Sequence, residues 1–140
     1  MKPILLDTGA IVACLDRREQ FHGRSAEIIL GLRAPLVTCE AVIAESCYLL
    51  RRLPAACEAV LDNVAAGIFQ IPFQLSESAA KVRRIVHQYR DHNIDLADAC
   101  LIQLANELGT GDILTLDRDF HIYRWGANKA FHSLILDSQP

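Results

Sequence analysis

The sequence contains no long uninterrupted apolar segment. Its first residues, MKPILLD, reach an acid before the hydrophobic core of a signal peptide could form, and its longest run without a charge, Asn63 to Ser76, contains Pro72 and several polar residues. A membrane-spanning helix needs about 20 mainly apolar residues, and a signal peptide needs an apolar core of roughly 7–15 residues. We therefore expect a cytoplasmic protein with no membrane span.

Cysteine motifs are also missing. The chain has five cysteines, an odd number, and no two of them form a CxxC pair. Each cysteine lies among apolar neighbours, which favours reduced, packed thiols over disulfides or zinc ligands. The five histidines show no ligand spacing either, so the sequence offers no candidate zinc site.

An excess of basic charge is lacking as well. The formal net charge is −3, whereas proteins that bind nucleic-acid phosphates usually present a basic surface. Two divalent cations held by acidic residues would change this formal charge from −3 to +1. The basic residues are 11 arginines and only 3 lysines, and arginine is the better bidentate partner for phosphate. The composition therefore leaves a nucleic-acid substrate open.

Short apolar runs alternate with helical patterns along the whole chain. A length of 140 residues suits one domain, 51% of the residues are hydrophobic, and no linker is evident. The expected strands are residues 2–6, 35–38, 67–71, 113–116 and 130–136, and the expected helices are residues 10–15, 22–32, 40–50, 54–66, 79–89 and 96–108. This alternation predicts one α/β domain over residues 1–140, with a mostly parallel sheet of about five strands covered by helices on both faces.

Four acids occupy matching positions in this pattern. Asp7 and Asp117 follow apolar strands, while Glu45 and Asp98 fall in the first two turns of their helices. In a parallel α/β sheet these positions meet at one edge, where ligands bind. Asp98 also lies among apolar neighbours, where an unpaired carboxylate is costly. Because four carboxylates cannot share a cleft without neutralisation, we expect them to meet cations.

The chemistry of these four side chains indicates which cation they would hold. All the donors are hard oxygens, with no cysteine or histidine at any of the four positions, so Mg²⁺ or Mn²⁺ is favoured over zinc or copper. Such ions activate water and stabilise charge during phosphodiester hydrolysis. The sequence does not distinguish one bound ion from two.

Four runs of the sequence resemble the PIN-domain ribonucleases, in particular the VapC toxins of VapBC toxin–antitoxin pairs. These runs are LLDTGAIVACLD, AVIAESCYLL, IDLADACLIQLANEL and ILTLDRDF, and they cover nearly the whole chain. The order of the acids is the specific feature, because no short motif among them is specific by itself. The resemblance implies a PIN-like three-layer α/β/α sandwich. It also implies Asp7, Glu45, Asp98 and Asp117 as the catalytic, metal-binding quartet, with Asp119 as a further metal neighbour.

The same resemblance implies Mg²⁺-dependent cleavage of RNA and an antitoxin partner that inserts a segment into the cleft. Gly9 departs from the family, where Ser often follows the Asp-Thr pair, so a hydroxyl role at that position is in doubt. Thr8 and Thr115 are expected to donate hydrogen bonds that orient the carboxylates. Asp95 is expected at the start of the helix that carries Asp98, as a neighbour of the site or as a helix cap.

Several other residues are candidates for contacts with RNA or with a second protein. Arg118, which follows the fourth acid, is the arginine expected to contact a phosphate. Tyr123 and Trp125 either stack on an unpaired base or pack against the last strand. The apolar helical segments 26–32 and 55–65 leave room for a homodimer face.

Three alternatives to a metal-dependent nuclease stay open at this point. The first is a metal-independent ribonuclease that uses His121, His132 and Lys129 as acid, base and phosphate clamp. The second is a phosphoryl-transfer protein with Asp7 as nucleophile, although no second acid follows two residues later. The third is a catalytically silent module that binds RNA or a partner protein.

Overall fold

A computed structural model describes residues 2–137 of the chain. Within these residues a five-stranded sheet has the order β3-β2-β1-β4-β7, and every neighbouring pair is parallel. Its strands are β1 (Ile4–Leu6), β2 (Leu36–Val37), β3 (Phe69–Gln70), β4 (Asp112–Leu114) and β7 (His132–Ser133). The expected α/β fold with a parallel sheet is confirmed.

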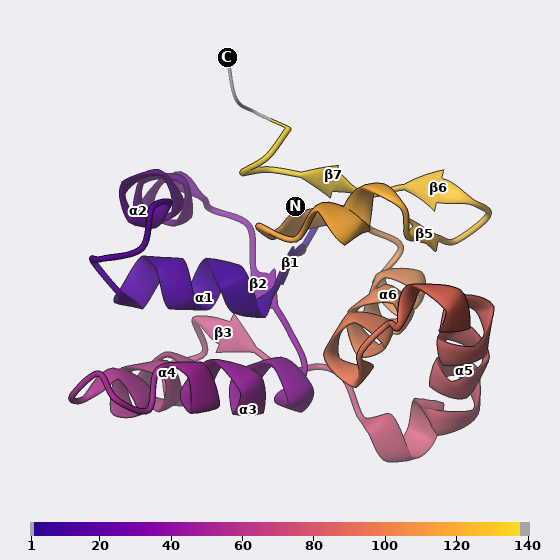
Figure 1. The fold of residues 1–140 in the computed structure, drawn as a ribbon, viewed down its shortest axis with the longest axis horizontal. Coiled ribbons are helices and arrows are strands. Elements are labelled where there is room, and N and C mark those ends of the chain that lie inside the picture. Colours follow the sequence, from indigo (N-terminus) through magenta and orange to yellow (C-terminus); the bar gives the residue numbers. More distant parts are fainter. Residues whose placement is uncertain (1, 138–140) are drawn as a thin grey trace.

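Helices cover both faces of this sheet. They are α1 (Thr8–Leu15), α2 (His22–Gly31), α3 (Glu40–Leu49), α4 (Ala56–Ala65), α5 (Leu75–Gln88) and α6 (Leu96–Leu108), with short 3-10 helices η1 (Arg90–His92) and η2 (Arg118–His121). Figure 1 shows α1 to α4 together on one side and α5 with α6 on the other. This division follows from right-handed crossovers, because β1, β2 and β3 progress toward one edge of the sheet while β4 and β7 extend it at the other.

The strand order therefore reverses between β1 and β4. These two strands are neighbours in the middle of the sheet, pairing Leu5 with Ile113 and Leu6 with Leu114. All four of these side chains are fully buried, as expected for the central strands of a sheet covered on both faces. The carboxyl ends of β1 and β4 flank the switch point at which open α/β sheets bind ligands.

Helix α6 has the bounds predicted from the sequence. Its nine residues from Ala97 to Ala105 are all buried, so the helix has little exposed face. The helix begins after the cap Asp95, whose side chain accepts a hydrogen bond from the Asp98 N–H, and ends at Gly109, which has a left-handed φ of 67°. These caps satisfy free backbone groups at both ends and fix the position of Asp98 in the first turn.

The expected last strand, residues 130–136, is wrong as a single element. The chain instead forms an antiparallel hairpin of β5 (Arg124–Trp125) and β6 (Lys129–Ala130), and only then the parallel strand β7. Ser133 ends β7, because its hydroxyl accepts from the Leu136 N–H and its carbonyl accepts from the Asp137 N–H. Among residues 2–137, the structure contains no helix with the length and apolar character needed to cross a membrane.

Candidate active site

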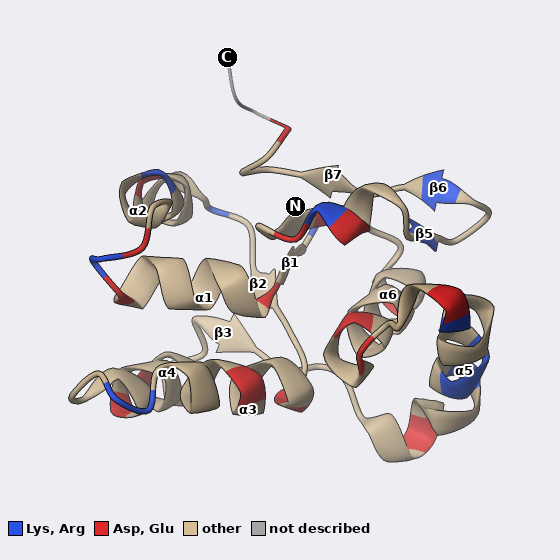
Figure 2. Ribbon diagram, viewed as in Figure 1, with Lys and Arg blue, Asp and Glu red and all other residues tan. Residues whose placement is uncertain are grey.

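The four predicted acids line one open cleft of about 340 Å³ at the carboxyl edge of β1 and β4. The cleft is lined by Asp7, Thr8, Gly9, Glu45, Leu49, Asp95, Asp98, Leu116 and Asp117. Figure 2 shows acidic segments after β1, on α3 and at the start of α6, whereas basic segments lie on α5 and β6. The structure thus brings together side chains from four separated parts of the chain.

Asp7 is held by two hydrogen bonds. It caps α1, and its Oδ1 accepts from the Thr8 N–H at 2.8 Å while its Oδ2 accepts from the Thr115 hydroxyl at 2.7 Å. Thr115 can reach Asp7 because it directly follows β4, the parallel neighbour of β1. Burial raises the pKa of Asp7 to about 6, against the effect of both hydrogen bonds, and the charges of Asp117 and Glu45 act in the same direction as burial.

Asp117 is fixed through the same threonine. Its N–H donates to Thr115 Oγ1 at 3.0 Å, and its own Oδ1 accepts from the Asp119 N–H at 2.9 Å, which caps η2. The strand β4 ends at Leu114, so Asp117 lies at the entrance of this short helix and not directly at the strand end. Burial raises the pKa of Asp117, and the hydrogen bond from the Asp119 N–H opposes that rise.

Asp98 projects into the cleft from the first turn of α6. The residue is 7% exposed, and burial, followed by the negative charge of Asp7, raises the pKa of its carboxyl to about 9. At neutral pH and without a bound cation this carboxyl therefore keeps its proton. A hydrogen bond between the carboxyls of Asp98 and Asp117 also lowers the pKa of Asp117, as expected when one acid of a close pair carries the proton.

Glu45 reaches the cleft from the other side, on α3. It is half-buried and lies one helical turn before Leu49, which also lines the cleft. Within residues 2–137 its carboxylate makes no hydrogen bond or ion pair. Glu45 is thus the acid of the quartet that is least constrained by its neighbours.

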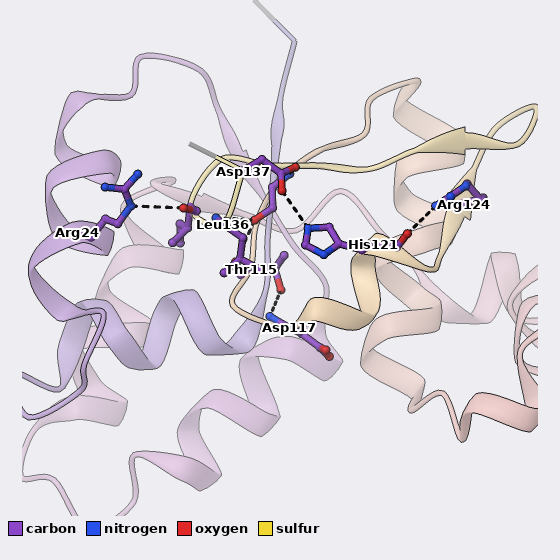
Figure 3. A network of polar contacts seen from close by, with 9 residues as sticks. Arg24, Thr115, Asp117, His121, Arg124, Leu136 and Asp137 are labelled. Atoms are coloured by element: carbon purple, nitrogen blue, oxygen red, sulfur yellow. Dashed lines mark hydrogen bonds and ion pairs between the residues drawn. The ribbon is translucent and has the colours of Figure 1, made fainter. Parts of the chain in front are cut away.

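A polar network continues from the cleft to the end of the described chain (Figure 3). The Ser133 hydroxyl donates to the Thr115 carbonyl at 3.2 Å, and the Ser133 N–H donates to Asp137 Oδ2 at 2.9 Å. The other oxygen of Asp137 lies 2.9 Å from Nε2 of His121, in η2. Sequence reasoning did not find Ser133 or Asp137, since a serine and an acid after a short strand carry no specific signal.

Other predicted site residues have different surroundings from those expected. Thr8 lines the cleft, but its hydroxyl is buried without a hydrogen-bond partner among the described residues, and it is the Thr8 N–H that orients Asp7. Asp119 and Arg118 are exposed and lie outside the cleft lining. In the described chain Arg118 has no hydrogen bond or ion pair.

Tyr123 is buried and Trp125 is half-buried, and both rings contact other residues of the protein. Tyr123 is 1% exposed and makes edge-to-face contacts with Tyr89 and Phe120, at centroid distances of 5.0 and 5.1 Å. Trp125 packs on Gly111, where a Cβ atom would overlap its ring, and its Nε1–H donates to the Ala130 carbonyl. Trp125 therefore contacts Ala130 of the expected last strand, whereas the ring contacts of Tyr123 are with Tyr89 and Phe120.

The residues of the rival metal-independent site each have a contact of their own, although, against the effect of burial, both histidines also help to lower the pKa of Asp137. His121 pairs with Asp137, and His132 Nδ1 lies 3.5 Å from Asp112 Oδ1. The Lys129 ammonium lies over the Trp125 ring at 4.9 Å. Each of the three proposed catalytic groups therefore has its own separate partner.

The chain belongs to the PIN-domain family. A model of the PIN domain matches residues 4–126. The chain is similar to Ribonuclease VapC26 of Mycobacterium tuberculosis, with 35% identity over 117 residues that make up 82% of this chain and 87% of that protein. Its fold is similar to the crystal structure of Mycobacterium tuberculosis VapC20, described as a sarcin–ricin loop cleaving toxin, with a TM-score of 0.76 and 15% identity, covering 83% of this chain and 91% of the other.

Proposed function

We propose that this protein is a divalent-metal-dependent endoribonuclease that hydrolyses RNA phosphodiester bonds, and that it is the toxin of a toxin–antitoxin pair. The observation that carries the proposal is the convergence of Asp7, Glu45, Asp98 and Asp117 at the switch point of a PIN fold. The relationship to Ribonuclease VapC26 supports RNA as the substrate. Such an enzyme would act in the cytoplasm.

The residues of the cleft fit Mg²⁺, with Mn²⁺ as a substitute. Two carboxyls with raised pKa values, Asp7 and Asp98, are buried together without a basic partner, which is unfavourable unless a cation binds. As the side chains stand, the described residues contain no group of three or more His, Cys, Asp or Glu that could hold an ion. Binding would therefore require the carboxylates to draw together, which their mutual repulsion opposes until the cation is present.

The chain's own residues have distinct proposed roles. Asp7, Glu45, Asp98 and Asp117 would hold Mg²⁺, and Asp119 would assist at the rim. When bound, the ion supplies a Lewis acid that activates water and stabilises charge on the phosphodiester. Thr115 orients Asp7 and Asp117, while Asp95 positions Asp98 by capping α6. The Thr8 hydroxyl, which is buried without a partner among the described residues, has no part in this proposal.

Arg118 is the proposed contact for a phosphate of the RNA. It is exposed beside Asp117 and has no acidic partner among the described residues. A free guanidinium next to an acidic cleft can bind phosphate in a bidentate way without entering the metal site.

The proposed antitoxin would cover apolar side chains next to the cleft. Leu49 lines the cleft and is 55% exposed, Tyr48 precedes it, and Leu96 follows the lining residue Asp95 and is 49% exposed. Exposed apolar residues of this kind mark sites of protein contact. Leu30 of α2 and Leu61 of α4, which are also exposed, support the separate expectation of a homodimer, which light scattering of the purified chain would test.

The test of the proposed function is RNA cleavage by the purified protein with Mg²⁺ and with EDTA. Cleavage is expected with Mg²⁺, none with EDTA, and none for Asp98→Asn in either buffer. Asp62→Asn, which changes an exposed acid of α4 outside the cleft, should cleave like wild type. Activity that survives EDTA would exclude the metal-dependent mechanism. A folded Asp98→Asn variant that cleaves normally would place the catalytic centre outside this cleft. A wild-type protein that binds RNA or a partner but cleaves no RNA with Mg²⁺ would support the catalytically silent alternative.

A further inference from the structure

A second open site lies between α5 and α6, outside the acidic cleft. This groove has a volume of about 360 Å³ and is lined by Lys81, Arg84, Ile85 and Gln88 of α5 and by Gln103, Asn106 and Glu107 of α6. No residue lines both the groove and the acidic cleft. Figure 2 shows the basic segments of α5 on the side of the protein that carries α6.

The floor of this groove is an ordered set of polar side chains. Gln103 is 4% exposed and is an exception among the mostly apolar buried residues of α6. Its amide donates to Glu107 Oε2 at 3.1 Å, and its carbonyl accepts from the Asn106 amide at 3.3 Å. The Ser78 hydroxyl donates to the same Glu107 oxygen at 2.8 Å. Because each of these groups is held by another, the floor is rigid and polar where two helices usually pack with apolar side chains.

The walls of the groove carry cations without acidic partners. Lys81 and Arg84 are exposed on α5, three residues apart and so on one face of the helix. Among residues 2–137 neither makes a hydrogen bond or an ion pair. Glu107 is the acid in the lining, and two hydrogen bonds already occupy one of its oxygens. Two free cations therefore outnumber one partly satisfied carboxylate.

Helix α6 connects this groove to the proposed catalytic centre. Asn106 lies eight residues after Asp98, which is about 12 Å along the helix and about 80° around it. Because residues 97–105 of α6 are buried, an RNA strand bound in the cleft would reach the groove over the neighbouring surface and not along α6 itself.

We propose that the groove between α5 and α6 binds a backbone phosphate of the RNA, outside the cleaved bond, through Lys81 and Arg84. This inference rests on the proposed ribonuclease function and adds a second contact region for its substrate. Contacts to phosphate carry no base identity, so the groove contributes affinity and register along the strand, not choice of sequence.

The test measures binding of a fluorescent single-stranded RNA of about 20 nucleotides by anisotropy, in an Asp98→Asn background that does not cleave. Lys81→Gln with Arg84→Gln is expected to weaken binding about tenfold and to reduce the slope of log K against log[salt] by about 0.7, for the one phosphate that is no longer bound. The matched control removes two exposed cations outside the groove, Arg52→Gln with Arg83→Gln, and should change both quantities far less.

A cleavage assay with active enzyme separates the possible failures. The groove variant should cleave a long RNA with a raised KM and an unchanged kcat, and should cleave a two-nucleotide substrate, too short to reach the groove, like wild type. If wild type cleaves RNA but the groove variant binds and cleaves like the control, the groove proposal is wrong and the proposed function stands. If wild type does not cleave RNA at all, the proposed function fails, and the groove loses its role with it. A groove variant that loses affinity only for a protein partner would assign the site to that partner and overturn the RNA proposal.

Discussion

The four acids of the cleft form two pairs that differ in how their carboxylates are held: Asp7 and Asp117 are linked through Thr115, whereas Glu45 and Asp98 have no such link. Asp7 accepts two hydrogen bonds from protein groups, Asp117 accepts one from the Asp119 N–H, and Thr115 links the two acids. Asp98 is buried with a raised pKa, and Glu45 has no hydrogen-bond partner among the described residues. The first pair, Asp7 and Asp117, is the preorganised half of the site. In the second pair, the less constrained half, Asp98 is buried in the first turn of α6 and Glu45 is the acid whose carboxylate no contact among the described residues holds. This difference teaches that the fold positions the strand-end acids before any ligand binds.

The largest loss of RNA cleavage is expected from single replacements of an acid, one variant in each half of the site. Asp7→Asn and Glu45→Gln should each reduce RNA cleavage on the order of a thousandfold or more, because each removes a charge that the cation requires. Cleavage rates measured at saturating Mg²⁺, with circular dichroism to show that both variants fold, would check this. If Glu45→Gln keeps most of the activity, the less constrained half is not part of the catalytic centre and the comparison between the halves fails.

Removing the Thr115 hydroxyl, which links Asp7 to Asp117, should reduce RNA cleavage less than the loss of an acid. Thr115→Val removes the hydroxyl that donates to Asp7 and accepts from the Asp117 N–H, and should lower activity roughly 10–100-fold with a raised Mg²⁺ requirement. Thr115→Ser, which keeps the hydroxyl, should recover most of the loss. Equal activity for the serine and valine variants would show that the hydrogen bonds do not organise the site.

The raised pKa values of the two buried acids, Asp7 and Asp98, should make the stability of the metal-free protein depend on pH. The pKa values of Asp7 and Asp98 are about 6 and about 9 in the folded protein and about 4 in an unfolded chain. The folded state therefore binds more protons between about pH 4 and pH 9, so stability in EDTA should fall as pH rises through this window. In EDTA at pH 8, Asp98→Asn should melt no lower than wild type, and we expect it to melt roughly 5 °C higher. A large drop in the melting temperature would mean that Asp98 is structural.

The smallest effect is expected at the far end of the polar network. Asp137→Asn weakens an exposed pair with His121, whose side chains are 43% and 31% exposed for the histidine and the acid, so it should cost less than about 1 kcal/mol of stability. Cleavage should stay within roughly twofold of wild type. A loss of activity as large as that of Thr115→Val would show that Asp137 helps to hold Asp7 and Asp117 in position.

The bounds of α6 and the meeting of Asp7 with Asp117 could be predicted from the sequence. They depend on local residue patterns and on the rule that ligand sites of open α/β sheets lie at the carboxyl ends of the strands. The bounds of α6 follow from its cap Asp95, its continuous apolar residues and Gly109. The meeting of Asp7 with Asp117 follows from strand-end positions and parallel pairing. Both predictions use information that lies within a few residues of each acid.

What could not be predicted depends on contacts between distant side chains. The division of residues 130–136 into a hairpin strand and a sheet strand requires Trp125 to pack on Gly111. The different role of Thr8, whose hydroxyl has no partner while its N–H holds Asp7, depends on the exact turn after β1. The groove between α5 and α6 was not found either, because a buried Gln103 in an apolar helix is visible as an exception only after the helix has been placed.

The pairing of β1 with β4 also has a consequence for when the chain becomes active during folding. The hydrogen bond from Thr115 to Asp7 spans 108 positions of the chain, so it can form only after a long loop has closed. While β4 is still being synthesised, Asp7 has neither Thr115 nor Asp117 beside it. A chain in which β1 and β4 have not yet paired would therefore lack two of the groups that surround Asp7 and would not cleave RNA by the proposed mechanism.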